Sequence, residues 1–145
     1  MKLSQTVEYN EEEIGTAHNS EAYKKQISSL AGSDPRILIL KYLLFMVANH
    51  SIHAIDYQSM VYGLKGPTGL DSKRLHIVFD ELDGFFNEER YMVQASFRVW
   101  CKVNKKDGTT YATPGNYLTG EGLRLAVKKP EEISKILGPH RIKFS

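Results

Sequence analysis

Few side chains in this sequence of 145 residues could carry out covalent or metal chemistry. Cys101 is the only cysteine, and it falls on the apolar side of an alternating stretch. A catalytic thiol needs a thiolate and a nearby base, so we interpret Cys101 as a buried, inert thiol. His50 and His53 have the spacing of metal ligands, but a zinc site would need further ligands. We therefore predict no catalytic residue, metal site or cofactor, and we do not expect an enzyme.

Basic side chains are the remaining candidates, because they are concentrated in the last third of the chain. Residues 91–145 contain ten Lys/Arg against four Asp/Glu, whereas residues 1–90 contain nine against thirteen. Such an asymmetry favours a surface that faces a polyanion, and an ordinary solvated face is the alternative. The basic residues must be positioned by the elements around them.

Four helices are predicted before this basic region. Ser20 or Asn19 can cap a first helix, which Gly32 can close. Asp34 followed by Pro35 predicts the start of a second helix, which is apolar on nearly every side. Such a helix is either buried all round or gives one face to another chain. Burial is the favoured interpretation, and a homodimer through residues 36–48 is the alternative.

A short helix capped by Asp56 is predicted to stop at Gly63, and the segment from Gly63 to Gly69 is predicted to be a turn. This glycine-rich segment lacks the spacing of a P-loop. The clearest amphipathic helix then begins at Asp71 or Ser72. Its apolar positions have the spacing of a single helix face: Leu75, Val78, Phe79 and Leu82.

Strands are predicted on both sides of a basic turn. Residues Tyr91 to Asn104 alternate as a half-buried strand, and the turn Lys105 to Gly108 leads to a return strand, Thr109 to Thr113. A looser strand, Leu123 to Val127, precedes a short C-terminal helix that begins at Pro130. Residues 1–18 are expected to be a flexible arm or an edge strand around Leu3 to Tyr9.

The order of these elements resembles a winged helix over about residues 34 to 113. The predicted fold class is therefore α+β: a winged-helix-like helical cluster on a small antiparallel sheet, with an extra N-terminal helix and a short C-terminal helix. Residues 1–145 are expected to form a single domain. In a helix-turn-helix the second helix enters the major groove, and here the hairpin would be the wing. The predicted nucleic-acid-binding residues are Ser72, Lys73, Arg74, His76, Arg98, Lys102, Lys105 and Lys106.

Two features argue against this hypothesis of a DNA-binding accessory or regulatory domain. The connector of about seven residues is longer than the three or four of a helix-turn-helix. The helix expected to enter the groove also carries acidic residues that would repel phosphate: Asp80, Glu81 and Asp83.

The alternative function is a small protein-binding module or inhibitor without nucleic acid, acting through Trp100, Tyr111 and Tyr117. Trp100 could instead cover a second core under the C-terminal helix. The expected partner is accordingly duplex DNA or an acidic protein. The longest apolar run is too short for a bilayer, and a single cysteine and no secretory signal favour a cytoplasmic location.

Overall fold

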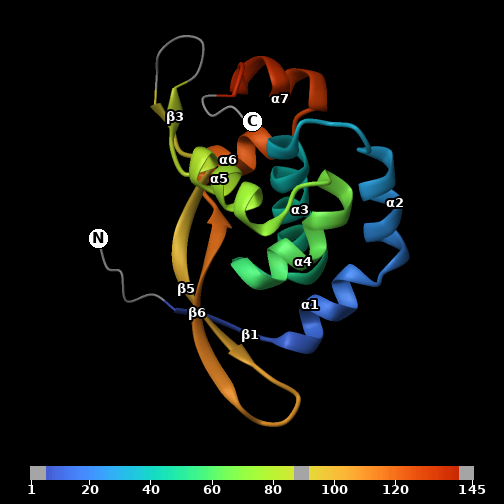
Figure 1. Ribbon diagram of the computed structural model, residues 1–145, viewed down its shortest axis with the longest axis vertical. Helices are drawn as coiled ribbons and strands as arrows, with labels where there is room; N and C mark the ends of the chain where they lie inside the picture. The colour runs from blue at the N-terminus through green and yellow to red at the C-terminus, as the bar shows by residue number, and fades with distance from the viewer. Residues whose placement is uncertain (1–5, 87–91, 141–145) are drawn as a thin grey trace.

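The computed structural model describes residues 6–86 and 92–140 and has an α+β architecture, as predicted (Figure 1). Within these residues the helices are α1 (Glu11–His18), α2 (Glu21–Ser29), α3 (Pro35–His50), α4 (Tyr57–Thr68), α5 (Ser72–Leu82), α6 (Gly120–Ala126) and α7 (Pro130–Leu137). The strands are β1 (Thr6–Asn10), β2 (Ile55–Asp56), β3 (Phe85–Phe86), β4 (Met92–Val93), β5 (Ser96–Asn104) and β6 (Thr110–Leu118).

The main sheet is mixed, with the strand order β1-β5-β6-β2. β5 and β6 form the predicted antiparallel hairpin, and β2 pairs with β6 in the antiparallel direction. β1 instead runs parallel to β5, with Thr6 beside Trp100 and Asn10 beside Asn104. The prediction of an antiparallel sheet is therefore wrong for β1. Direction could not be read locally, because the partner of β1 lies far along the chain.

The N-terminal segment contains both an edge strand and a helix. β1 covers part of the strand expected around Leu3 to Tyr9, and residues 1–5 lie outside the described residues. The run Glu11, Glu12 and Glu13 forms the first turn of α1, which the sequence analysis did not predict. Negative side chains are favourable there because the N-terminal end of a helix carries partial positive charge.

α3 is the centre of the hydrophobic core. Its buried residues include Leu38, Leu40, Tyr42 and Met46, and helices and strands from β1 to α7 contribute to the same core cluster. Figure 1 shows α3 surrounded by the other helices and the sheet. Burial within the chain thus accounts for the all-round apolar pattern. The alternative, a dimer through residues 36–48, would need an exposed apolar face that most of this helix does not have.

Side-chain caps begin the predicted helices where the sequence places them. Ser20 Oγ accepts a hydrogen bond from Tyr23 N, and Asp34 Oδ1 accepts one from Arg36 N. Asp56 and Asp71 cap α4 and α5 in the same way. Each cap satisfies a backbone N–H group that has no partner inside the helix.

α4 is longer than predicted, because it continues through Gly63 to Thr68. Pro67 lacks an N–H group, so it cannot donate to the carbonyl of Gly63 four residues earlier. The hydroxyl of Tyr23 donates to that carbonyl instead, at 3.0 Å. The helix ends at Gly69, which has a φ of 71°. The connector to α5 is therefore residues 69–71, and the predicted seven-residue turn is wrong.

Two further predictions about strands need correction. The strand predicted from Tyr91 to Asn104 is divided into β4 and β5, and Tyr91 itself lies outside the described residues. The division falls at Ala95, whose N–H donates to Leu82 O at 3.0 Å and whose carbonyl accepts from Thr119 N at 3.1 Å. Residues 123–127, predicted as a strand, belong mainly to α6, whose start is capped by Thr119.

Tyr9 connects the two edge strands of the main sheet across its interior. The hydroxyl of Tyr9 in β1 donates to Asp56 Oδ1 in β2, and it accepts from Asp56 N at 2.8 Å. Gly115 in β6 leaves room beside this contact, since a Cβ there would lie 2.2 Å from Ile55 O and 2.7 Å from Cys101 Sγ. A side chain at residue 115 would therefore force strands apart.

Candidate functional sites

The start of α5 is exposed, as a DNA-reading helix requires. Ser72, Lys73 and Arg74 are all exposed, and Arg74 lies 3.8 Å from Asp71 across one helical turn. His76 is less accessible, because its ring packs against Tyr57 with the ring centroids 5.0 Å apart. The accessible basic part of this helix is therefore its first turn.

The hairpin lysines lie against the acidic start of α1. Lys106 Nζ is 3.7 Å from Glu12 Oε1, and both side chains are exposed. Lys105 Nζ lies 5.3 Å from the centre of the Tyr111 ring, within cation–π range. The tip of the hairpin thus adjoins the run of glutamates from Glu11 to Glu13, whose negative charge offsets its own.

The end of α5 and the hairpin turn lie at opposite ends of β5. α5 packs at the Ser96 end of β5, where Ser96 Oγ donates to Asp83 Oδ1 at 2.6 Å. Lys105 and Lys106 follow the other end of this nine-residue strand, a distance of about 26 Å along it. Tyr57 of α4 contacts the α5 side, whereas its neighbour Gln58 lines a pocket with Lys105. The charged groups of the two predicted basic patches have different partners: Asp71 for Arg74 and Glu12 for Lys106.

The open sheet face is the uncovered side of the main sheet toward the hairpin turn. It consists of Thr6, Glu8, Arg98, Trp100, Lys102, Ala112 and Pro114. Trp100 is at its centre, between Thr6 and Pro114 in register, and half of its side chain is exposed. The expectation that Trp100 covers a second core under the C-terminal helix is therefore wrong.

Tyr111 and Tyr117 do not share this face with Trp100. Trp100 pairs with Pro114, whereas Tyr111 pairs with Val103 and Tyr117 pairs with Phe97. Successive side chains of a strand point to opposite sides, so both tyrosines lie on the other side of the sheet. Both are partly buried. The predicted aromatic set is therefore not one surface.

Arg98 joins the open sheet face to α4 and α5. Its Nε donates to the Tyr57 hydroxyl at 3.1 Å, and its guanidinium group lies 3.6 Å from Asp80. Burial raises the pKa of the nearby Asp83 to about 6, although the hydroxyl of Ser96 and the charge of Arg98 act in the opposite direction. Arg98 is thus partly neutralised by its own chain.

The thiol of Cys101 is buried, as predicted. Burial and the nearby Asp56 raise the pKa of this thiol to about 12. A group with that pKa is protonated at neutral pH, so it is neither a nucleophile nor a metal ligand in this state.

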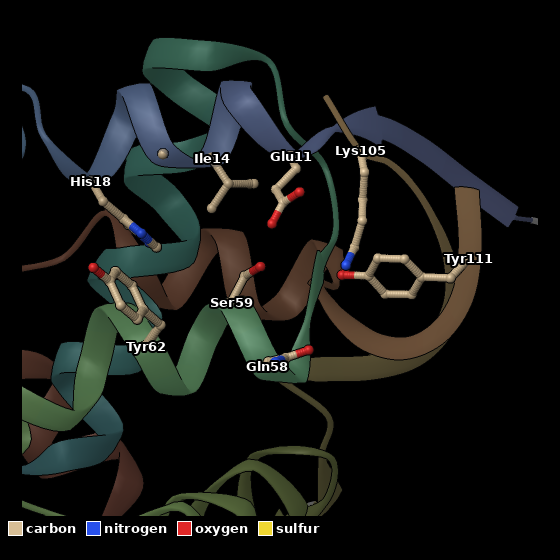
Figure 2. A pocket seen from close by; sticks show the side chains of 9 residues that line it. Glu11, Ile14, His18, Gln58, Ser59, Tyr62, Lys105 and Tyr111 are labelled. Atoms are coloured by element: carbon tan, nitrogen blue, oxygen red, sulfur yellow. The ribbon is translucent and has the colours of Figure 1, made fainter. Parts of the chain in front are cut away.

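A pocket of about 270 Å³ lies between α1, α4 and the turn of the β5–β6 hairpin (Figure 2). We refer to it as the α1–α4 pocket. Its lining consists of Glu11, Ile14, Gly15, His18, Gln58, Ser59, Tyr62, Lys105 and Tyr111. Of these residues, Lys105 and Tyr111 were predicted from the sequence to be functional, but as parts of other surfaces.

His18 is held at one end of this pocket by aromatic neighbours. Its Nε2 lies 2.7 Å from the hydroxyl of Tyr42, which is fully buried. Gly63 permits this position, because a Cβ there would lie 2.5 Å from His18 Nε2. Burial lowers the pKa of His18, so its imidazole is neutral at physiological pH. The ring of Tyr62 stacks on the other side, with the ring centroids 5.9 Å apart.

A helical spacing could have revealed part of the pocket. Glu11, Ile14 and His18 are separated by three and four residues, which places them on one face of a helix. The segment was not predicted to be helical, however. α4 was predicted to stop at Gly63, whereas it continues to Thr68.

Comparison with known proteins found no matching family model, curated protein or solved structure. Among the described residues, none of the helices has the length and apolar character needed to cross a bilayer.

Proposed function

We propose that this protein is a small protein-binding module that contacts its partner through the open sheet face. The observation that carries the proposal is the exposure of Trp100, which is half accessible at the centre of a regular strand. Tryptophan is among the residue types that dominate the energetics of protein interfaces. When a second surface removes a large aromatic side chain from water, the apolar area that it buries contributes favourably to the free energy of binding.

The charges around Trp100 favour a partner with acidic groups beside an apolar contact. Arg98 and Lys102 lie two residues away on either side of Trp100 and are exposed on the same face. Glu8 lies beside Lys102 in register on β1 and supplies one negative charge. An acidic rim on the partner would complement the two exposed basic side chains and would speed association, in a way that depends on salt.

The test is affinity capture from the native cell after nuclease treatment, with the wild-type protein and two variants. Trp100→Ala should lose partners that the wild-type protein retains. Leu123→Ala removes another exposed apolar side chain, outside the sheet, and should retain them. Partners that bind Trp100→Ala and the wild-type protein equally would exclude the open sheet face as the interface.

A second candidate function, duplex DNA binding, is favoured by the connector between α4 and α5. Residues 69–71 form a turn of the length found in helix-turn-helix motifs. The length of the connector, which argued against DNA binding on the sequence alone, is therefore no longer an objection. β2 beside β6 also gives the helix, strand, helix, helix and hairpin order of a winged helix. Against it, Lys106 of the hairpin turn adjoins Glu12, whose negative charge would repel phosphate.

DNA binding has a distinct salt dependence. Each phosphate contact contributes about 0.9 to the slope of the logarithm of the binding constant against the logarithm of salt concentration. Replacing Lys73 and Arg74 with glutamine should reduce this slope by about 2 if both contact phosphates. Affinity that does not change with salt would exclude this candidate.

A further inference from the structure

The α1–α4 pocket has one charged end. Figure 2 shows Glu11 and Lys105 on the same side of the opening, with Tyr111 beside Lys105. Within the described residues, no ion pair of 4.0 Å or less joins Glu11 to Lys105. The neighbouring contact between Lys106 and Glu12 is an exposed ion pair, so it contributes little to the position of the hairpin turn. One carboxylate and one ammonium group are therefore available at this end without neutralising each other directly.

The other end of the pocket is aromatic and uncharged. Figure 2 shows His18 and Tyr62 opposite Lys105, with Ile14 on the α1 side. Tyr62 is 81% exposed, the most accessible of the large apolar side chains in the described residues. The imidazole of His18 is neutral because burial lowers its pKa, so it adds no positive charge. This end of the pocket carries no charge, so it can pack against the aromatic ring of a ligand.

The floor of the pocket between these ends is polar. Ser59 and Gln58, from the first turn of α4, lie below the opening in Figure 2. A hydroxyl and an amide can each donate and accept hydrogen bonds, so they suit the polar head of a small ligand. The pocket volume of about 270 Å³ is just below the range of about 300 to 1,000 Å³ that is typical of small-molecule sites.

We propose that the α1–α4 pocket binds a free aromatic α-amino acid. The ligand's ammonium group would face Glu11, its carboxylate would face Lys105, and its ring would pack against Tyr62 and Ile14. Because Glu11 and Lys105 are at the same end, their counter-charges must be close together on the ligand, as they are on one α-carbon. A purely anionic or cationic ligand would leave one of the two protein charges desolvated without a partner. This site is separate from the open sheet face and does not depend on the function proposed for it.

The experiment is isothermal titration of the full chain with L-phenylalanine, followed by two analogues that each lack one charge. We expect saturable binding of L-phenylalanine with one site per chain. Phenethylamine, which lacks the carboxylate, and 3-phenylpropanoate, which lacks the ammonium group, should each bind at least about tenfold more weakly, because each leaves one charge-assisted hydrogen bond unmade. L-Alanine, which keeps both charges and lacks the ring, should also bind more weakly.

Matched variants separate the pocket from general charge effects. Glu11→Gln and Lys105→Met should each weaken L-phenylalanine binding about tenfold or more. Glu13→Gln and Lys106→Met remove the same charges from neighbouring exposed positions that do not line the pocket, and they should bind like the wild-type protein. Trp100→Ala should also leave this binding unchanged, which keeps the outcome independent of the proposed interface.

Two results would overturn the proposal. One is the absence of saturable binding of L-phenylalanine, L-tyrosine and L-tryptophan at millimolar concentration to a wild-type protein whose circular dichroism shows that it is folded. The other is binding that Glu11→Gln and Lys105→Met weaken no more than Glu13→Gln and Lys106→Met do.

Discussion

Replacing Tyr9 with phenylalanine isolates the contact that joins the two edge strands of the main sheet. The change keeps the ring in the core and removes the hydroxyl that bonds to Asp56 twice. The carboxylate oxygens of Asp56 accept from the hydroxyl of Tyr9 and from Ser59 N. A hydrogen bond to a charged acceptor contributes about 1.5–3 kcal/mol and a neutral one about 0.5–1.5 kcal/mol. The expected loss in the free energy of unfolding is therefore about 2–4.5 kcal/mol.

Urea denaturation measures this loss. Circular dichroism reports the helices, and fluorescence reports the sheet, since Trp100 is the only tryptophan and lies in β5. The midpoint should fall while the slope with urea is unchanged, because the surface exposed on unfolding is nearly the same. For a chain of this size, the expected fall in Tm is about 10 °C.

The matched control is Tyr62→Phe, which removes the hydroxyl of an exposed tyrosine on α4. Surface substitutions of this kind usually change stability by less than about 0.5 kcal/mol. If Tyr9→Phe loses less than about 1 kcal/mol relative to the wild-type protein, the hydroxyl does not join the edge strands in the way described.

Three further predictions test other features of the fold. Gly115→Ala should lower stability by about 3 kcal/mol, because its Cβ would meet a backbone carbonyl, whereas Gly120→Ala at an open position should change little in the same thermal melts. Burial raises the pKa of Asp83 to about 6, above the value of about 3.9 in an unfolded chain. The contribution of its protonation to the free energy of unfolding is therefore fully present below pH ~4 and is lost as pH rises through about 6. Asp83→Asn should remove about 1 kcal/mol of this pH dependence, after allowance for solvent screening, and an unchanged pH profile of urea midpoints would contradict it. Compared with free tryptophan, iodide should quench the fluorescence of Trp100 relatively more than caesium does, because Arg98 and Lys102 attract anions to the open sheet face, and equal quenching by the two ions on this relative scale would show that this face is not basic.

The starts of four predicted helices could be identified from the sequence because each depends on neighbouring residues. Ser20, Asp34, Asp56 and Asp71 cap backbone groups two or three residues away, so the signal is local. The end of α4 could not be predicted in this way. Glycine and proline normally end a helix, but here a tyrosine from α2 supplies the hydrogen bond that the proline cannot.

The candidate sites were only partly predictable, because they too combine local patterns with contacts between distant segments. The alternation of residues in β5 predicted that Trp100 and Cys101 point to opposite faces, and in the structure they lie on opposite sides of the sheet. The position of Tyr111 depends on the register of the hairpin, which the identity of single residues does not reveal. The α1–α4 pocket combines three segments that are distant in sequence, so its composition required the tertiary structure.

The parallel pairing of β1 with β5 determines when this part of the protein can form during synthesis on the ribosome. Thr6 is made long before its partner Trp100, and the ribosome adds about 5–20 residues per second. β1 must therefore wait roughly 5–20 s for β5 to emerge, while the helices between them can already form from local contacts. β1 is thus among the last elements to pair with its partner. A peptide that mimics β5 would pair with β1 of the nascent chain in that interval.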